Sequence, residues 1–304
     1  MKLASTHWMR QEPLARTIAR LADAGYDGIV IDGNPGRLKA VKVEVLLQHY
    51  GIACHGVLPI IQNPYDLIDP DADVRKATVD YLCTLVRLAA DLGADLLSLA
   101  PYREGRLTPR AAPEEEWAWS VDGLKRVAGL GIELGVTVGI EPVNRYETNM
   151  VNRHDQAIAL AEAVGDGAGV ILDTFHMNLE ERDICAAIEA TGPWLCEVQF
   201  ADSNRLAPGR GHLDWAAILA SLARVGFDGY LTAEMQAPED RLPTAWPARS
   251  DLAPLVTESA AEAPFLRAND GFPQSDADYT ASLREAADFL RARLAETGGA
   301  AVER

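Results

Sequence analysis

Short apolar runs recur along the chain, and stretches whose apolar residues have helical spacing separate them. The clearest copies are LADAGYDGIVID (21–32) and LARVGFDGYLTAE (222–234), which share a helix end, a glycine, an aromatic residue, Asp-Gly and an apolar run closed by an acid. The runs are continuous, as is typical of parallel strands buried on both faces. Strands are therefore predicted near 2–6, 28–32, 52–58, 95–100, 136–141, 169–173, 196–201 and 230–235.

Eight repeats of a strand followed by a helix predict the fold class. Amphipathic stretches such as VRKATVDYLCTLVRLAADL separate the apolar runs. This order favours an α/β fold, a single-domain (β/α)8 TIM barrel over residues 1–304. A doubly wound open sheet is the alternative. It would favour a glycine-rich phosphate loop after the first strand, and STHWMRQEP contains no glycine.

One segment interrupts the rhythm between the eighth strand and the last helix. Residues 237–275 are rich in Pro and Ala without clear periodicity, and a final helix is predicted at about 277–296. A loop this long inside a compact domain is usually functional or disordered. We expect an insertion that forms a lid or an oligomer contact over the catalytic face. The tail at 297–304 is expected to fray.

Composition limits the classes of function. The 304 residues are 48% hydrophobic and carry a formal charge of −17, which would repel a phosphate backbone and argues against nucleic acid as a partner. No run is long enough for a membrane span, and MKLASTHWMR lacks the apolar core of a signal peptide. The four cysteines show no CxxC spacing, which fits free thiols in a reducing compartment. We expect a cytoplasmic protein without membrane contacts.

Oxygen-donating side chains stand where four of the predicted strands end. Glu141, Asp173, Gln199 and Glu234 follow one another at intervals of 26 to 35 residues, about one strand–helix unit each. In a TIM barrel the carboxyl ends of the strands meet at one mouth, so these side chains can converge. Such donors suit a hard divalent cation, Mn²⁺ or Mg²⁺. Gln199 could instead satisfy a buried backbone group.

The decapeptide LDTFHMNLEE allows two interpretations of Asp173. An Asp at this point could cap the helix that follows, or it could bind a metal at the end of its strand. His176 lies three residues further on. It could be a satisfied structural group, or an imidazole that polarises a carbonyl in the barrel mouth.

The stretches GIEPVNRYETN, LDTFHMNLEE and ADSNRLAPGRGHLDW resemble the sugar isomerase/epimerase family with a xylose-isomerase-like barrel. That family includes ketose 3-epimerases and hydroxypyruvate isomerases. The resemblance covers strands five to eight closely and the first half of the chain in overall plan. Its motifs are specific for the superfamily and much less so for the substrate.

The resemblance implies roles for individual residues. The metal ligands would be Glu141, Asp173, Gln199 and Glu234, which favours the ligand interpretation of Asp173. His176 would hydrogen-bond the carbonyl end of the substrate. Other substrate oxygens would be bound by Glu147 and Arg205. His212 could contact substrate or belong to a helix entry.

Position 199 departs from the ketose 3-epimerase pattern. Those enzymes usually carry histidine there, whereas the hydroxypyruvate isomerases use glutamine. Metal ligation survives this change, because the glutamine carbonyl is an oxygen donor. The identity of the substrate stays open.

The expected chemistry is proton transfer beside a carbonyl. A divalent cation, Mn²⁺ in the first place with Mg²⁺ or Co²⁺ as alternatives, makes the neighbouring C–H acidic. Glu141 and Glu234 are the expected acid–base pair. Return of the proton to the same carbon gives epimerisation, return to the next carbon gives aldose–ketose isomerisation, and loss of a β-hydroxyl gives dehydration.

We therefore expect a metal-dependent sugar epimerase or isomerase, like a ketose 3-epimerase, that acts on a small sugar as a homo-oligomer, either a dimer or a tetramer. The alternatives are a hydroxypyruvate-isomerase-like enzyme and a lyase or dehydratase acting on a keto-sugar or inosose. A metal-dependent apurinic-site endonuclease of the same fold would need a histidine-rich zinc site, and the six histidines show no such spacing. A sugar-binding barrel without activity would not require both glutamates.

Overall fold

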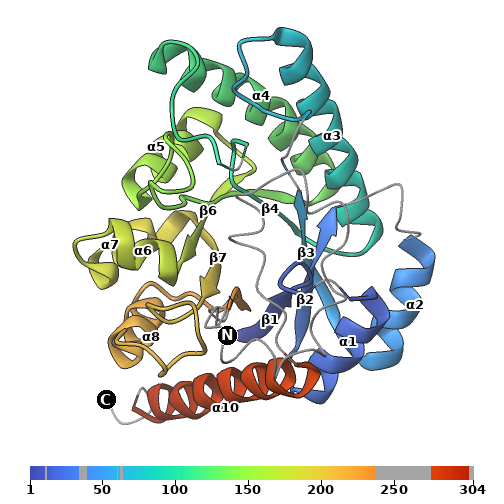
Figure 1. Ribbon diagram of the computed structural model, residues 1–304, viewed down its shortest axis with the longest axis vertical. Helices are drawn as coiled ribbons and strands as arrows, with labels where there is room; N and C mark the ends of the chain where they lie inside the picture. Colours follow the sequence, from blue (N-terminus) through green and yellow to red (C-terminus); the bar gives the residue numbers. More distant parts are fainter. Residues whose placement is uncertain are drawn as a thin grey trace, which may run out of the picture.

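The eight predicted strands form a closed parallel barrel in sequence order (Figure 1). The computed structural model describes residues 1–10, 12–33, 40–59, 61, 64–103, 105–236 and 275–300, with side chains up to 296. The strands are β1 (Lys2–Thr6), β2 (Gly28–Gly33), β3 (Ala53–Pro59), β4 (Leu96–Leu99), β5 (Thr137–Ile140), β6 (Ala168–Asp173), β7 (Leu195–Phe200) and β8 (Tyr230–Ala233). The barrel closes where β8 pairs with β1. The TIM barrel prediction is confirmed, and each strand lies within two residues of its expected ends.

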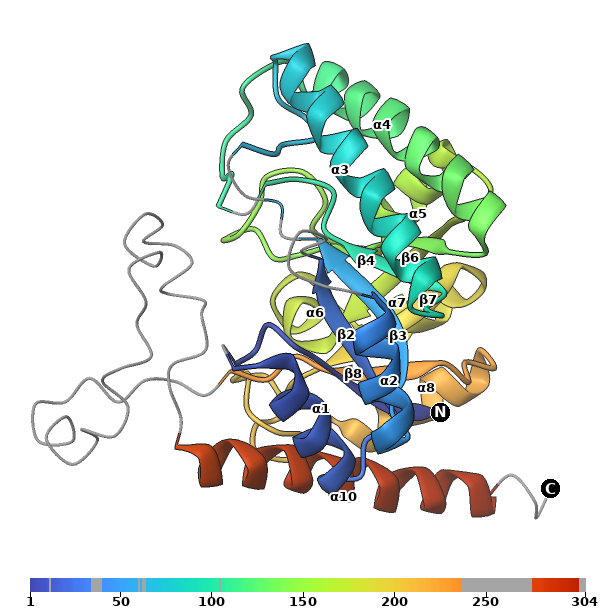
Figure 2. The same cartoon turned by 90° about the vertical axis from the view of Figure 1, so that its right-hand side faces the viewer.

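Helices cover the outside of the barrel (Figures 1 and 2). They are α1 (Leu14–Asp23), α2 (Ala40–Tyr50), α3 (Ala72–Asp91), α4 (Pro113–Leu134), α5 (His154–Val164), α6 (Thr174–Glu180), α7 (Ile184–Thr191), α8 (Trp215–Arg224) and α10 (Asp276–Ala300). Gly25 and Gly226 follow α1 and α8 with φ of 80° and 72°, the left-handed conformation that glycine adopts without a steric penalty. None of the described helices is both long and apolar enough to cross a membrane.

The last helix closes the ring of helices at the seam between β8 and β1. Figures 1 and 2 show α10 lying along α1, and it also packs against α8. It extends to Ala300, so the first four residues of the expected tail are helical. Residues 301–304 and most of the expected insertion, 237–274, lie outside the described residues.

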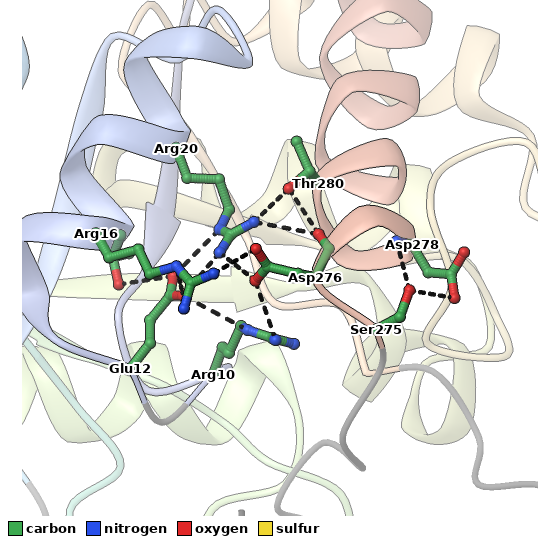
Figure 3. A network of polar contacts seen from close by, with 9 residues as sticks. Arg10, Glu12, Arg16, Arg20, Ser275, Asp276, Asp278 and Thr280 are labelled. Atoms are coloured by element: carbon green, nitrogen blue, oxygen red, sulfur yellow. Dashed lines mark hydrogen bonds and ion pairs between the residues drawn. The ribbon is translucent and has the colours of Figure 1, made fainter. Parts of the chain in front are cut away.

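An ion-pair network holds the start of α10 against the β1–α1 loop (Figure 3). The buried Arg20 guanidinium lies 2.8 Å from Glu12 Oε2 and 2.7 Å from Asp276 Oδ1. Arg10 and Arg16 contact the same two carboxylates. This network fixes the loop that follows β1, which lies at the carboxyl end of the barrel.

The interior of the barrel is polar as well as apolar. Gln199 on β7 hydrogen-bonds Ser98 on β4, and Glu197 on β7 lies 3.4 Å from His55 on β3. Since β7 is not adjacent to β3 or β4 in the closed sheet, these contacts cross the interior. All four side chains are buried. A column of polar groups therefore runs inside the barrel up to the ends of the strands.

Candidate metal centre and active site

The four strand-end residues lie together at the carboxyl end of the barrel. Asp173 and Gln199 are register partners in β6 and β7. Glu141 directly follows β5, and its N–H donates to Leu99 O of β4 at 2.9 Å. Glu234 directly follows β8, and its N–H donates to Phe200 O of β7 at 3.0 Å. The barrel ladder thus continues through both glutamates, and all four side chains are buried.

Asp173 is both a helix cap and a free carboxylate oxygen. Its Oδ1 accepts a hydrogen bond from Phe175 N at 2.7 Å at the start of α6. Its Oδ2, like Gln199 Oε1, is buried and has no hydrogen-bond partner among the described residues. Buried oxygens without a donor are costly, and a cation would satisfy both. These two orphaned oxygens fit an oxygen-ligated divalent metal.

The carboxyl groups of the site have raised pKa values. Burial, and then the negative charges of Glu234 and Asp173, hold the pKa of Glu141 well above its usual range. Burial and the charge of Asp173 do the same for Glu234. Burial raises the pKa of Asp173 to about 6. Several buried carboxylates at one point repel one another, and a bound cation removes that repulsion.

His176 on α6 faces this cluster with its Nε2 atom, which lies 3.6 Å from both Glu141 Oε1 and Asp173 Oδ2. These three residues place ligand atoms within 4.8 Å of one another, and they are the one such group of His, Cys, Asp and Glu side chains in the described part of the chain. The imidazole is therefore placed to contact a metal ion as well as a substrate. Burial and the Arg205 charge hold the pKa of His176 well below its usual range, so the ring is neutral at pH 7.

Asn144 places two donors at one nitrogen of His176. Its backbone N–H lies 3.3 Å from Nδ1 and its side-chain Nδ2 2.8 Å from the same atom. The amide orientation is fixed, because Oδ1 accepts from Tyr146 N and Nδ2 donates to Glu147 Oε1. A guanidinium N–H of Arg205 faces the other nitrogen, Nε2, at 3.2 Å, so donors face both ring nitrogens, of which a neutral ring can accept at only one. His176 is thus held between Asn144 and Arg205 at the barrel mouth.

Arg205 occupies a strained backbone position beside the cluster. Its φ of 59° makes it the one non-glycine residue with positive φ in the described ranges. Its guanidinium lies over the Phe175 ring at 4.4 Å, with Nη2 3.7 Å from Asp173 Oδ2 and 3.2 Å from His176 Nε2. Strain of this kind persists where the surroundings fix the residue, and it is common in functional sites.

Asp202, which the sequence patterns did not indicate, holds the loop that carries Arg205. It is fully buried and accepts hydrogen bonds from the backbone N–H groups of Ser203, Gly209 and Leu213 and from Trp215 Nε1. Burial alone would raise the pKa of Asp202, but these donors outweigh it and lower the pKa. Asp202 N–H also donates to Leu206 O at 2.8 Å.

The other two expected substrate contacts, Glu147 and His212, lie in different parts of the structure. Glu147 lies beside the cluster, with Oε1 4.0 Å from His176 Nδ1. His212 is exposed in the loop before α8 and contacts Ser203 Oγ through Nδ1 at 2.9 Å. The structure thus brings together seven of the eight expected site residues and places His212 at the surface.

Trp8, Asn144 and Glu197 join the site in the structure and were not among the predicted ligands. Trp8 follows β1 and donates from Nε1 to Glu234 Oε1 at 3.3 Å. Its position just after a strand was the one available signal. Glu197 lies two residues before Gln199 on β7, so both side chains point to the same side of the strand. Glu197 is fully buried.

The closed parallel barrel with buried carboxylates at its mouth defines a TIM barrel with a candidate metal centre. Comparison with known proteins makes the assignment specific: residues 18–269 match the model of the xylose isomerase-like TIM barrel family. The chain belongs to this family, as its sequence motifs indicated.

Relatives with known activities agree with this family assignment. The chain is 31% identical over 233 residues to an L-ribulose 3-epimerase of Mesorhizobium japonicum, which covers 75% of this chain and 77% of the relative. It is 30% identical over 225 residues to a ketose 3-epimerase of Arthrobacter globiformis, with coverage of 73% and 78%. A solved L-ribulose 3-epimerase structure superposes with a TM-score of 0.83 at 25% identity, over 100% of this chain and 98% of that one. The expected class, an enzyme that epimerises or isomerises sugars, is confirmed.

Proposed function

We propose that the protein is a divalent-metal-dependent ketose 3-epimerase. The observation that carries this proposal is the placement of two buried glutamates, Glu141 and Glu234, at the ends of β5 and β8 with Asp173 and Gln199 between them along the barrel rim. The names of the relatives support the ketose substrate and the position of the reacting carbon.

The cation would be held by Glu141, Asp173, Gln199 and Glu234, with Mn²⁺ as the expected ion. When bound, it supplies the positive charge that makes the C–H beside the substrate carbonyl acidic. His176 would hydrogen-bond the carbonyl end of the sugar. Arg205 and Glu147 would bind further hydroxyl groups.

The two glutamates would carry the proton transfer. One, as carboxylate, takes the proton from C3 and leaves an enediolate of the sugar. The other, as carboxylic acid, delivers a proton to the opposite face of the same carbon, which inverts it. One group must hold a proton and the other must accept one, so the two glutamates must differ in protonation when the sugar binds.

A hydroxypyruvate-isomerase-like activity is the second candidate, and Gln199 favours it because that branch carries glutamine at this position. A lyase or dehydratase acting on a keto-sugar or inosose would use the same groups. We further propose a cytoplasmic homo-oligomer. All four cysteines are free, which suits a reducing compartment, and light scattering would give the oligomeric state.

Proton NMR in D₂O with a panel of ketoses, aldoses, inososes and hydroxypyruvate tests the proposal. An epimerase exchanges deuterium into C3 of a ketose and forms its epimer. Exchange with a shift of the carbonyl indicates the isomerase, and loss of water indicates the lyase. The absence of turnover with every substrate in the presence of Mn²⁺ would contradict all three.

Glu141→Gln and Glu234→Gln test the two-base scheme, since glutamine keeps an oxygen donor but cannot take a proton. Both variants should retain metal and lose net conversion. Each should exchange solvent deuterium into one epimer only, and the two variants should select opposite epimers. The same isotope pattern in both variants would favour a single base.

A further inference from the structure

Glu197 is a buried carboxylate for which the proposed reaction has no direct use. It points into the barrel from β7, two residues before Gln199, and its side chain is 0% exposed. Its Oε1 accepts a hydrogen bond from the Thr232 hydroxyl of β8 and lies 3.4 Å from His55 Nε2 of β3. Three strands therefore contribute to its surroundings. An isolated charge at this depth would be costly, so its partners matter.

Its partners keep Glu197 an acceptor. Burial alone would lower the pKa of His55, but the carboxylates of Asp95 and Glu197 outweigh it and raise that pKa to about 9, so the imidazole is cationic at neutral pH. The ring is also stacked on Tyr230 at 4.1 Å, which holds it in place. The Thr232 hydroxyl donates to Glu197 and the cationic His55 ring lies beside it, so both neighbours favour a Glu197 oxygen as an acceptor.

The side-chain amide of Gln199 lies directly above this carboxylate. Its Nε2 donates to Glu197 Oε2 at 3.5 Å and to Ser98 Oγ of β4 at 3.3 Å. Its Oε1 has no hydrogen-bond partner within the described ranges. If the amide were rotated by 180°, its carbonyl oxygen would face the Glu197 carboxylate and its NH₂ group would take the place of the unpartnered oxygen. Only the observed orientation offers an oxygen to a cation.

We propose that Glu197 is a positioning residue that fixes the side-chain amide of Gln199 so that its oxygen, and not its nitrogen, is presented to the divalent metal. The inference rests on the proposed metal site. It explains why a glutamine can serve at this position, since a free amide would present nitrogen about as readily as oxygen. Partners that orient a metal ligand typically change metal affinity by about 10- to 100-fold when they are removed.

Two other roles for Glu197 make different predictions. Its negative charge could attract the cation directly, whichever residue lies at 199. Alternatively, it could only fill the barrel interior, in which case its loss would lower stability without a specific effect on metal binding. Glu197→Gln separates charge from orientation, because its carbonyl oxygen can still accept from Gln199 Nε2.

The test is Mn²⁺ binding to the metal-free full chain, with free Mn²⁺ measured by electron paramagnetic resonance. Glu197→Leu should weaken binding about 10- to 100-fold, and Glu197→Gln should stay within about threefold of wild type. In a Gln199→Ala background, Glu197→Leu should have no further effect, because the ligand through which it acts is gone. Thr191→Val, which removes a buried hydroxyl bonded to Ala187 O on α7, is the matched control and should not alter binding.

Circular dichroism and thermal melts establish that each variant is folded. If Glu197→Leu does not fold, Ser98→Ala removes the other acceptor of the amide with a smaller change. It should weaken Mn²⁺ binding in the Gln199 protein and not in the Gln199→Ala background.

Equal losses in Glu197→Gln and Glu197→Leu, or a further loss in the Gln199→Ala background, would overturn the orientation role in favour of direct charge. Unchanged binding in Glu197→Leu and Ser98→Ala would leave only the filling role. Unchanged Mn²⁺ binding in the single variant Gln199→Ala would instead refute the proposed ligand set.

Discussion

Raising the pH from about 6 to about 8.5 should remove most of the stability that His55 contributes to the barrel. Burial lowers the pKa of this imidazole, but Asp95 and Glu197 outweigh it and raise the pKa from 6.5 to about 9. A group with a raised pKa in the folded state stabilises that state below its unfolded pKa, and the contribution fades as the pH rises through the folded value. With these values the contribution is about 3 kcal/mol at pH 6 and about 1 kcal/mol at pH 8.5.

Denaturant unfolding of the metal-free protein, compared with His55→Gln at both pH values, measures this contribution. The difference in unfolding free energy between the two proteins should shrink by about 2 kcal/mol as the pH rises. His49→Gln, an exposed substitution on α2, should leave the pH dependence of wild type unchanged. NMR titration of the His55 ring gives the pKa directly. A pKa at or below about 6.5, or a free-energy difference that is constant with pH, would refute the ion pair with Glu197.

Three further predictions concern the metal site. Chelation should abolish activity, and added Mn²⁺ or Mg²⁺ should restore it. Gln199→His should shift the metal preference, measured as kcat/KM, toward Co²⁺ or Zn²⁺. Activity in a protein that elemental analysis shows to be free of metal would contradict the site. Mn²⁺ affinity should fall as the pH drops below about 6, because burial raises the pKa of Asp173 to about 6 and protons then compete for its carboxylate. A Mn²⁺ affinity that calorimetry finds constant with pH in this range would argue against ligation by Asp173. Asp173→Asn should keep the hydrogen bond from Phe175 N that caps α6 and change Tm little, but it should weaken Mn²⁺ binding more than about 100-fold. A large fall in Tm with intact Mn²⁺ binding would show that Asp173 serves as a helix cap and not as a ligand.

The fold could be predicted because its signal is local and repeated. Each strand is a short apolar run, and glycines such as Gly25 and Gly226 mark the helix ends that precede two of them. Eight such units leave few arrangements other than a closed barrel. Residues 237–274 carry no periodic signal, and they lie outside the described residues.

The site could be predicted only where its residues sit at strand ends. Glu141 and Glu234 end apolar runs, so their position in the barrel follows from strand order alone. Other groups join the site by contacts that the sequence does not mark, and these are Asn144, Asp202 and Glu197. One such contact joins Asn144 to His176, which is 32 positions away in the sequence. No periodicity encodes a hydrogen-bond partner of that kind, so these groups emerge only from the folded chain.

The two interpretations of Asp173 were never exclusive, because a carboxylate has two oxygens. One oxygen caps α6 through Phe175 N, and this bond turns the other toward the cluster, where it has no partner in the described structure. Serine or threonine could cap the helix but would leave no second oxygen, and asparagine would present an NH₂ group to the cation. Aspartate can therefore start the helix and still offer an anionic oxygen to a metal. Gln199 meets the same requirement in another way, since its NH₂ group is held by Ser98 and Glu197 and its oxygen is left free.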